Sequence, residues 1–209
     1  MYFDINSMKN RARELITSNK LSMVCGVFII AIFWLLVISW GRLSTHIGVL
    51  WGLFIWLIFM AIFLLVLNSI KMYCMKISRG EKALKSDIFI AFKKNQVKAF
   101  FLALIKGICI FLGLAGLILG ALIPIYLFRF AEYILNDNEE YSPMKALGKS
   151  MDLIRGHFLE LIRIDISLLA FLLLCVFSGG LAGIYTIPYT QMVYAEYYDY
   201  LKGLNENNE

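Results

Sequence analysis

The sequence predicts an all-α protein, a polytopic membrane bundle of six transmembrane helices in three repeated units. Each unit is an interfacial amphipathic helix followed by a transmembrane hairpin. Of the 209 residues, 60% are hydrophobic and 17% are charged, whereas soluble domains are about half apolar and a quarter charged. The apolar residues form long runs, and most of the basic residues lie between those runs on one predicted side. This composition excludes a disordered chain and a soluble enzyme.

The first unit is predicted to begin with an amphipathic helix, because apolar side chains recur at spacings of three and four residues. These residues are Ile5, Met8, Ala12 and Leu15. The apolar runs Leu21–Trp40 and Ile47–Ile70 follow. Each run is long enough to span a bilayer, which takes about 20 residues. The first run exceeds the core of a signal peptide, so we expect it to remain as a helix.

Two later apolar stretches, Ala99–Leu135 and Ile164–Leu201, are too long for single spans. Each covers roughly 40 residues, or about 55 Å of helix, whereas the hydrocarbon core is about 30 Å thick. We therefore interpret each stretch as a hairpin of two helices. The turns are expected near Leu119–Leu122 and at Ser178–Gly180, since both regions contain glycine.

The distribution of basic residues orients the spans. With six spans and both termini in the cytosol, most of the 20 Lys and Arg residues fall on the cytosolic side. A four-span alternative would place several of them outside, which the positive-inside rule disfavours. Those residues are Lys145, Lys149, Arg155 and Arg163.

An internal repeat supports the division of this single membrane domain, residues 1–209, into the units 1–70, 71–135 and 136–209. Ile123-Pro124 and the following Ala131–Tyr133 recur, at the same spacing, as Ile187-Pro188 and Ala195–Tyr197. Such repeats of two-span units in parallel orientation are common in membrane proteins.

An amphipathic helix is also predicted before each later hairpin. In the third unit Ser142 is a candidate N-cap, and Pro143 suits the first helical position. The predicted apolar face there consists of Met144, Leu147, Met151, Ile154 and Phe158. Before the third span, Leu84, Ile88 and Ala91 indicate a similar but less regular face.

Ionisable residues inside predicted spans are the main candidates for a functional site, because charges are costly in a bilayer. They are Lys106, Arg129, Glu132, Asp165 and Glu196. One interpretation is that they pair and lock the helices together, and Arg129 and Glu132 are spaced to pair on one helix face. The other is a polar cavity, open to the cytosol, that binds an anionic headgroup or a small solute.

The sixth predicted span is unusually polar. Thr186, Tyr189, Thr190 and Gln191 could line a solute path. They could equally form hydrogen bonds between helices, together with a belt of interfacial tyrosines. Pro188 is compatible with both interpretations, because it kinks the helix and leaves a backbone carbonyl unbonded.

No motif points to catalysis, a cofactor or a metal. His46 and His157 fall on opposite predicted sides of the membrane and lack a zinc-protease context. The four cysteines form no CxxC pair. The acidic segment Asp137–Glu140 is interpreted as a solvated turn. Basic residues between Lys71 and Lys98 are explained by anionic lipid headgroups at the cytosolic face, so no nucleic-acid partner is predicted.

The last third of the chain carries motifs of a known family. They are Ser150-x2-Leu153-Ile154-Arg155-Gly156-x-Phe158, then Leu161–Ser167, Ile187-Pro188-Tyr189 and Tyr198-x2-Leu201. This part resembles a family of bacterial integral membrane proteins named domain of unknown function nine-seven-five. It is more distantly similar to the membrane domain of some bacterial glycerophosphodiester phosphodiesterases. The resemblance implies a multi-pass protein of the bacterial cytoplasmic membrane, and it implies no activity.

Two functions remain open at this point. One is a non-enzymatic membrane protein that binds a protein partner, as an accessory component of a transport or export system. The other is a small transporter or lipid-handling protein with a cytosol-facing polar cavity. The small size and short loops favour the first, whereas the repeat and the intramembrane charges favour the second.

Overall fold

The computed structural model describes residues 4–18, 31–32, 34–35, 38–39, 51, 66–81, 96–116 and 118–206, without the side chains of residues 96, 110–122 and 206. Helices are the only regular secondary structure in this part, so the all-α prediction is confirmed there. Most of the predicted spans Leu21–Trp40 and Ile47–Ile70 lies outside it. The amphipathic face predicted at residues 84–91 also lies outside it.

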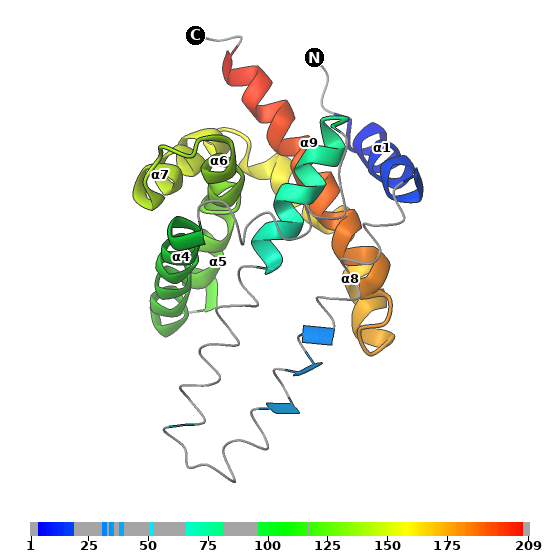
Figure 1. Cartoon of the computed structure of the whole chain (residues 1–209), viewed down its shortest axis with the longest axis horizontal. Coiled ribbons are helices and arrows are strands. Elements are labelled where there is room, and N and C mark those ends of the chain that lie inside the picture. Colours follow the sequence, from blue (N-terminus) through cyan, green and yellow to red (C-terminus); the bar gives the residue numbers. More distant parts are fainter. Residues whose placement is uncertain are drawn as a thin grey trace.

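The described helices begin with α1 (Ile5–Ser18), followed by a helical segment at residues 66–78, here called helix 66–78. The remaining helices are α4 (Gln96–Gly116), α5 (Ile118–Leu127), α6 (Ala131–Asp137), α7 (Pro143–Ile154), α8 (Phe158–Phe177) and α9 (Gly183–Glu206). Figure 1 shows α4 and α5 side by side as one hairpin and α8 and α9 as another, with both chain ends at the same end of the molecule. Within the described residues, none of the helices combines the length and the apolar character that a membrane crossing requires.

The two predicted turns have different outcomes. The turn at Ser178–Gly180 is confirmed, and Gly179 and Gly180 adopt φ angles of +62° and +94°, which side chains disfavour. The turn near Leu119–Leu122 is wrong, because α4 ends at Gly116 and α5 begins at Ile118. Several glycines occur in this apolar stretch, and no polar residue marks which of them ends the helix.

The amphipathic helix of the third unit is confirmed as α7, and its buried face is rotated from the predicted one. The Ser142 hydroxyl accepts a hydrogen bond from the backbone N–H of Lys145 at 3.3 Å, and Pro143 is the first helical residue. Met144 and Met151 are exposed, and Phe158 belongs to α8. The buried face consists of Ala146, Leu147, Ser150, Leu153 and Ile154. The small residues on this face, Ala146 and Ser150, lie where α7 packs closely against α6.

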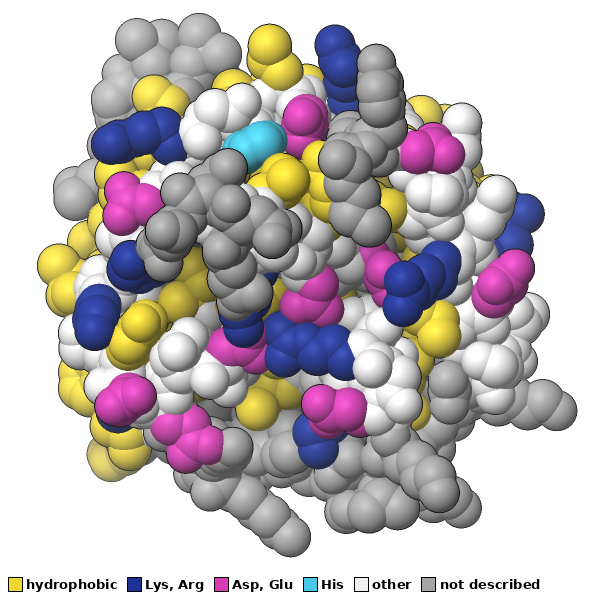
Figure 2. Space-filling model, turned by 90° about the horizontal axis from the view of Figure 1, so that it is seen from above, with side chains coloured by type: hydrophobic (Ala, Val, Ile, Leu, Met, Phe, Trp, Pro, Cys, Tyr) yellow, Lys and Arg dark blue, Asp and Glu magenta, His cyan; other side chains and the backbone are white. Residues whose placement is uncertain are grey.

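The core lies near the end of the molecule where the two termini are found. Rings of Phe130, Tyr133, Tyr197 and Tyr198 pack against one another with centroids 5.5–6.0 Å apart. In α1, Ala12 and Ile16 are buried, and the predicted face residues Ile5, Met8 and Leu15 pack against the core. Figure 2 views the molecule from this end and shows basic and acidic side chains close together over it. Further along the hairpins, large apolar side chains of α4 and α8 are exposed.

Candidate functional site

Four of the five predicted intramembrane charges lie together between the two hairpins. Lys106 comes from α4, Arg129 from the turn after α5, Glu132 from α6 and Asp165 from α8. Lys71 of helix 66–78 and Tyr194 of α9 join them, and these six residues are here called the central polar cluster. Lys71 and Tyr194 were not predicted as site residues. Lys71 follows the predicted second span directly, so its position resembled that of an ordinary flanking lysine.

Glu132 binds two ammonium groups in one half of the cluster. Its Oε1 lies 3.0 Å from Nζ of Lys106, and its Oε2 accepts a bond from Nζ of Lys71. The three side chains are only 15–20% exposed. Partly buried charges of this kind are stable when they are paired and hydrogen-bonded. Glu132 therefore ties α6 to both α4 and helix 66–78.

Arg129 and Asp165 form the other half of the cluster. The two terminal guanidinium nitrogens donate to the two carboxylate oxygens at 3.0 Å each, which is a bidentate pair. The Tyr194 hydroxyl donates to the same carboxylate at 2.7 Å. The guanidinium carbon lies 5.1 Å from the Tyr126 ring centre and 4.6 Å from that of Tyr194. Cation–π contact on these two rings and the bidentate pair hold the guanidinium in one orientation.

The pairing of Arg129 with Glu132, considered from their spacing, is wrong. Both residues have other partners in the structure. The reason is the break in the helix, because residues 128–130 form a turn and α6 begins only at Ala131. Arg129 and Glu132 therefore do not share a helix face, and the three-residue spacing loses its meaning.

Glu196 lies apart from the central polar cluster. It is on α9 at the contact with α1, where its Oε1 lies 3.3 Å from Nε of Arg11. Glu196 occupies the same place in the sequence repeat as Glu132. The two glutamates differ in their surroundings because α9 continues as one helix where the chain before Glu132 forms a turn.

Two cavities adjoin the central polar cluster and share Arg129 and Tyr194 in their walls. The first has a volume of about 350 Å³ and is lined by Asp165, Thr186 and Thr190 together with apolar side chains of α8. We call it the leucine cavity after Leu168, Leu169 and Leu172. The second has a volume of about 220 Å³, and we call it the lysine cavity. Its remaining lining residues are Lys71, Lys106, Ile125, Tyr133 and Gln191.

The predicted path residues of the sixth span divide between these cavities. Thr186 and Thr190 line the leucine cavity, and Gln191 lines the lysine cavity. Tyr189 lines neither of the two, because it is buried, with its ring against those of Phe171 and Tyr185. Among the described residues, no cluster of His, Cys, Asp and Glu is arranged to hold a metal ion.

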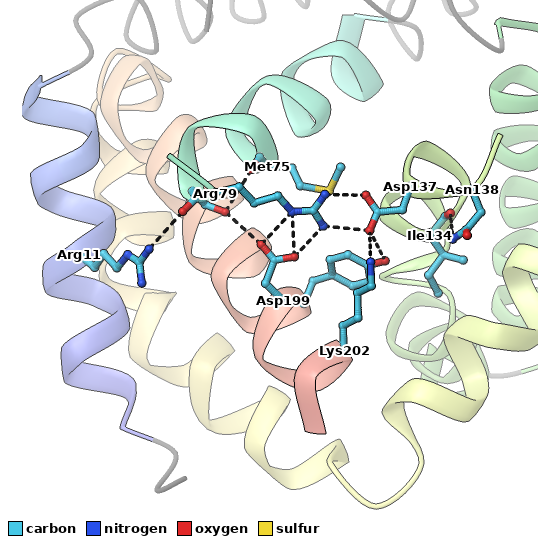
Figure 3. A network of polar contacts seen from close by, with 10 residues as sticks. Arg11, Met75, Arg79, Ile134, Asp137, Asn138, Asp199 and Lys202 are labelled. Carbon is cyan, nitrogen blue, oxygen red and sulfur yellow. Dashed lines mark hydrogen bonds and ion pairs between the residues drawn. The ribbon is translucent and has the colours of Figure 1, made fainter. Parts of the chain in front are cut away.

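A second polar network lies nearer the chain ends, and Figure 3 shows it from close by. Arg79 donates to both oxygens of Asp137 at 2.7 and 2.9 Å and to Asp199 at 2.7 Å. Lys202 lies 3.0 Å from Asp137, and the Tyr198 hydroxyl donates to Asp137 at 3.1 Å. We call Arg79, Asp137, Asp199 and Lys202 the end clasp. It joins the residue after helix 66–78 to α6 and α9.

The end clasp corrects the interpretation of Asp137–Glu140 as a solvated turn. The Asp137 side chain is only 7% exposed. Its partners Arg79 and Lys202 are distant in sequence, so no local pattern distinguishes Asp137 from the exposed acids that follow it. Burial alone would raise the pKa of Asp137, but the hydrogen bonds from Arg79 and Lys202 outweigh it and hold the pKa below the usual 3.8.

This lowered pKa predicts acid sensitivity. A carboxylate whose pKa is depressed by folding stabilises the fold above its unfolded pKa, and this contribution is lost as the pH falls through the folded value. The melting temperature of the wild type should therefore drop as the pH falls below about 4, and more steeply than that of Asp137→Asn. Thermal melts across this range measure the difference. Asp152→Asn, an exposed acid on α7, is the control, and equal slopes for the wild type and Asp137→Asn would contradict the prediction.

Residues 114–205 match the model of a family described as Protein of unknown function (DUF975). The resemblance to this family that the motifs predict is therefore confirmed over these residues. The DUF975 match contains Arg129, Glu132, Asp165 and Tyr194, whereas Lys71 and Lys106 precede it. No curated protein and no solved structure matches the chain.

Proposed function

We propose that this protein is a multi-pass membrane protein of six spans, with both termini in the cytosol, that binds and handles a lipid. The leucine cavity carries this proposal. Its wall combines a fixed ion pair and two threonine hydroxyls with a row of leucines. A site of this composition suits a molecule with a polar head and an apolar tail.

The membrane setting is supported by two features. The sequence contains long apolar runs with basic residues between them. The described part of α8 also exposes large apolar side chains that water would disfavour. They are Leu159, Ile166, Leu172, Leu173, Leu174, Val176 and Phe177. A bacterial cytoplasmic membrane, implied by the family resemblance, would cover them with lipid.

The route into the cavity is supported by the exposure of its leucines. Leu169 and Leu172 line the cavity, and they are also 48% and 60% exposed. The apolar side of the cavity is thus continuous with the exposed face of α8. A lipid tail could enter from that face while its head reaches Arg129, Thr186 and Thr190.

A second candidate function is supported by the same exposed face. Exposed apolar patches also bind protein partners. The chain would then be a non-enzymatic accessory component of a transport or export system, with a transmembrane helix of the partner against α8.

Photo-crosslinking tests the proposal. The full-length protein is reconstituted with a phospholipid that carries a photoreactive acyl chain, and the labelled peptides are identified by mass spectrometry. We expect labels on α8 and α9 residues of the leucine cavity. Thr190→Phe fills the cavity without changing its charge, so it should reduce this labelling. Leu173→Phe, which alters an exposed α8 residue outside the cavity wall, is the matched control.

Other outcomes would reject the proposal. Labelling spread evenly over the exposed apolar surface, or undiminished in Thr190→Phe, would show that the cavity takes no lipid. A protein recovered in equal amount with the chain from native membranes, together with undiminished labelling, would favour the accessory function.

A further inference from the structure

The lysine cavity has an unusual wall. Three cationic side chains line it, namely Lys71, Lys106 and Arg129. The other lining residues are Ile125, Tyr133, Gln191 and Tyr194, so none of the residues known to line this cavity is acidic. Glu132 binds both ammonium groups without itself lining the cavity, and Asp165 lines the leucine cavity instead. The wall of the lysine cavity is therefore positively charged.

Within the part of the chain that the structure describes, the charges of the central polar cluster do not balance. Lys71, Lys106 and Arg129 carry three formal positive charges, against two negative charges on Glu132 and Asp165. All five side chains are 15–20% exposed. An uncompensated charge at such partly buried positions is unfavourable. A bound anion with one negative charge would neutralise the cluster.

The same residues have hydrogen-bond donors to offer an anion. An ammonium group has three donors and a guanidinium has five. Glu132 takes one bond from each lysine, and Asp165 takes two from Arg129. The Gln191 side-chain oxygen accepts a bond from the Tyr133 hydroxyl at 3.1 Å, so its amide nitrogen keeps two donors. Several donors from four different side chains thus surround one small cavity.

We propose that the lysine cavity binds the phosphate group of an anionic molecule. The inference rests on the proposed lipid-handling function and adds the chemical class of the ligand. The two cavities share Arg129 and Tyr194 in their walls, so they are adjacent. An acyl chain attached to a phosphate in the lysine cavity would then lie in the leucine cavity, beside Leu168 and Leu172. A phospholipid with one net negative charge supplies both an anionic phosphate for the lysine cavity and an acyl chain for the leucine cavity. Free phosphate supplies only the anionic group.

Binding of matched probes to the purified full-length protein in a neutral detergent tests this inference. The probes are a fluorescent phosphatidylglycerol, a diacylglycerol with the same chains and label, and inorganic phosphate. Phosphatidylglycerol should bind at least about tenfold more tightly than diacylglycerol, because charge-assisted hydrogen bonds are strong. Lys106→Gln and Lys71→Gln should each reduce its affinity about tenfold, and Lys106→Arg should retain it.

The variants keep the test interpretable. Each lysine substitution leaves Glu132 one ammonium partner, so we expect each variant to fold, even where its melting temperature is lower than that of the wild type. Lys98→Gln is the matched control for Lys106→Gln, since both lysines are on α4. Lys98 donates to the backbone carbonyl of Glu139 and lines neither cavity. Lys98→Gln removes the same charge and should not change the affinity.

The outcomes separate the inference from the function on which it rests. Equal affinity for diacylglycerol and phosphatidylglycerol, lost in Thr190→Phe, would overturn the phosphate site and leave lipid binding in place. Stabilisation by inorganic phosphate, lost in Lys106→Gln, without binding of either lipid would support the phosphate site and reject lipid handling. Phosphatidylglycerol binding that Lys106→Gln and Lys98→Gln weaken equally would overturn the inference, and absence of all binding would overturn both.

Discussion

Replacing Asp165 with asparagine should lower the free energy of unfolding by about 3 kcal/mol. The substitution removes the charge that neutralises Arg129, and the guanidinium is held in place by two aromatic rings. Breaking one side of a buried pair costs more than the pair itself contributes, because the remaining charge stays buried. Both side chains are 19% exposed, so the loss should lie at the lower end of the range for buried pairs. Thermal unfolding of the purified protein in detergent measures it.

The double variant Arg129→Gln/Asp165→Asn is the control for this expectation. It removes both charges, so no unpaired charge stays in the cluster and most of the lost stability should return. The double variant should also lose phosphatidylglycerol binding, because it lacks the guanidinium that is part of both cavity walls. A single variant as stable as the wild type would show that water compensates Arg129 and that the pair does not hold the hairpins together.

Arg79→Met should lower the free energy of unfolding by about 2–3 kcal/mol. Arg79 donates to both Asp137 and Asp199, so its loss leaves two carboxylates near each other with a single neighbouring ammonium. Asp137 is affected most, because its side chain is only 7% exposed and keeps only Lys202 and the Tyr198 hydroxyl as partners. Thermal unfolding and protection of α9 amides from hydrogen exchange both measure this loss.

Lys202→Met is the matched control for the end clasp. Lys202 also binds Asp137, but its side chain is 43% exposed, and exposed ion pairs contribute at most about 1 kcal/mol. We therefore expect a smaller loss than in Arg79→Met. If the two variants lost equal stability, the central position of Arg79 between two carboxylates would not matter.

Several local features could be predicted from the sequence. The Ser142 cap, the proline that follows it and the turn at Ser178–Gly180 depend on a few neighbouring residues, and the structure contains all of them. The helical character of α1 and α7 follows from apolar residues spaced three and four apart. The exposed side of α7 was predicted less well. Long flexible methionines fit either a buried or an exposed position, so Met144 and Met151 do not define the face.

The candidate site could be predicted in part. Charges within apolar runs are expensive, and for this reason Lys106, Arg129, Glu132 and Asp165 could be selected without a structure. Their partners could not be. Spacing suggested a pair within one helix, whereas the turn at residues 128–130 separates Arg129 from Glu132. Lys71 is 61 positions from Glu132 in the chain, and sequence periodicity carries no information over such a distance.

The sequence by itself therefore determined the helical class, several helix ends, the family resemblance and the residues whose charge must be neutralised. These features depend on backbone preferences and on the cost of burying charge, which act locally. Only the tertiary structure decided which charges meet, that Asp137 is buried in a clasp, and that three cations line one cavity while two carboxylates lie outside it. Those facts depend on how separate helices pack, because an ion pair forms between whichever charged groups the packed helices bring within a few ångströms.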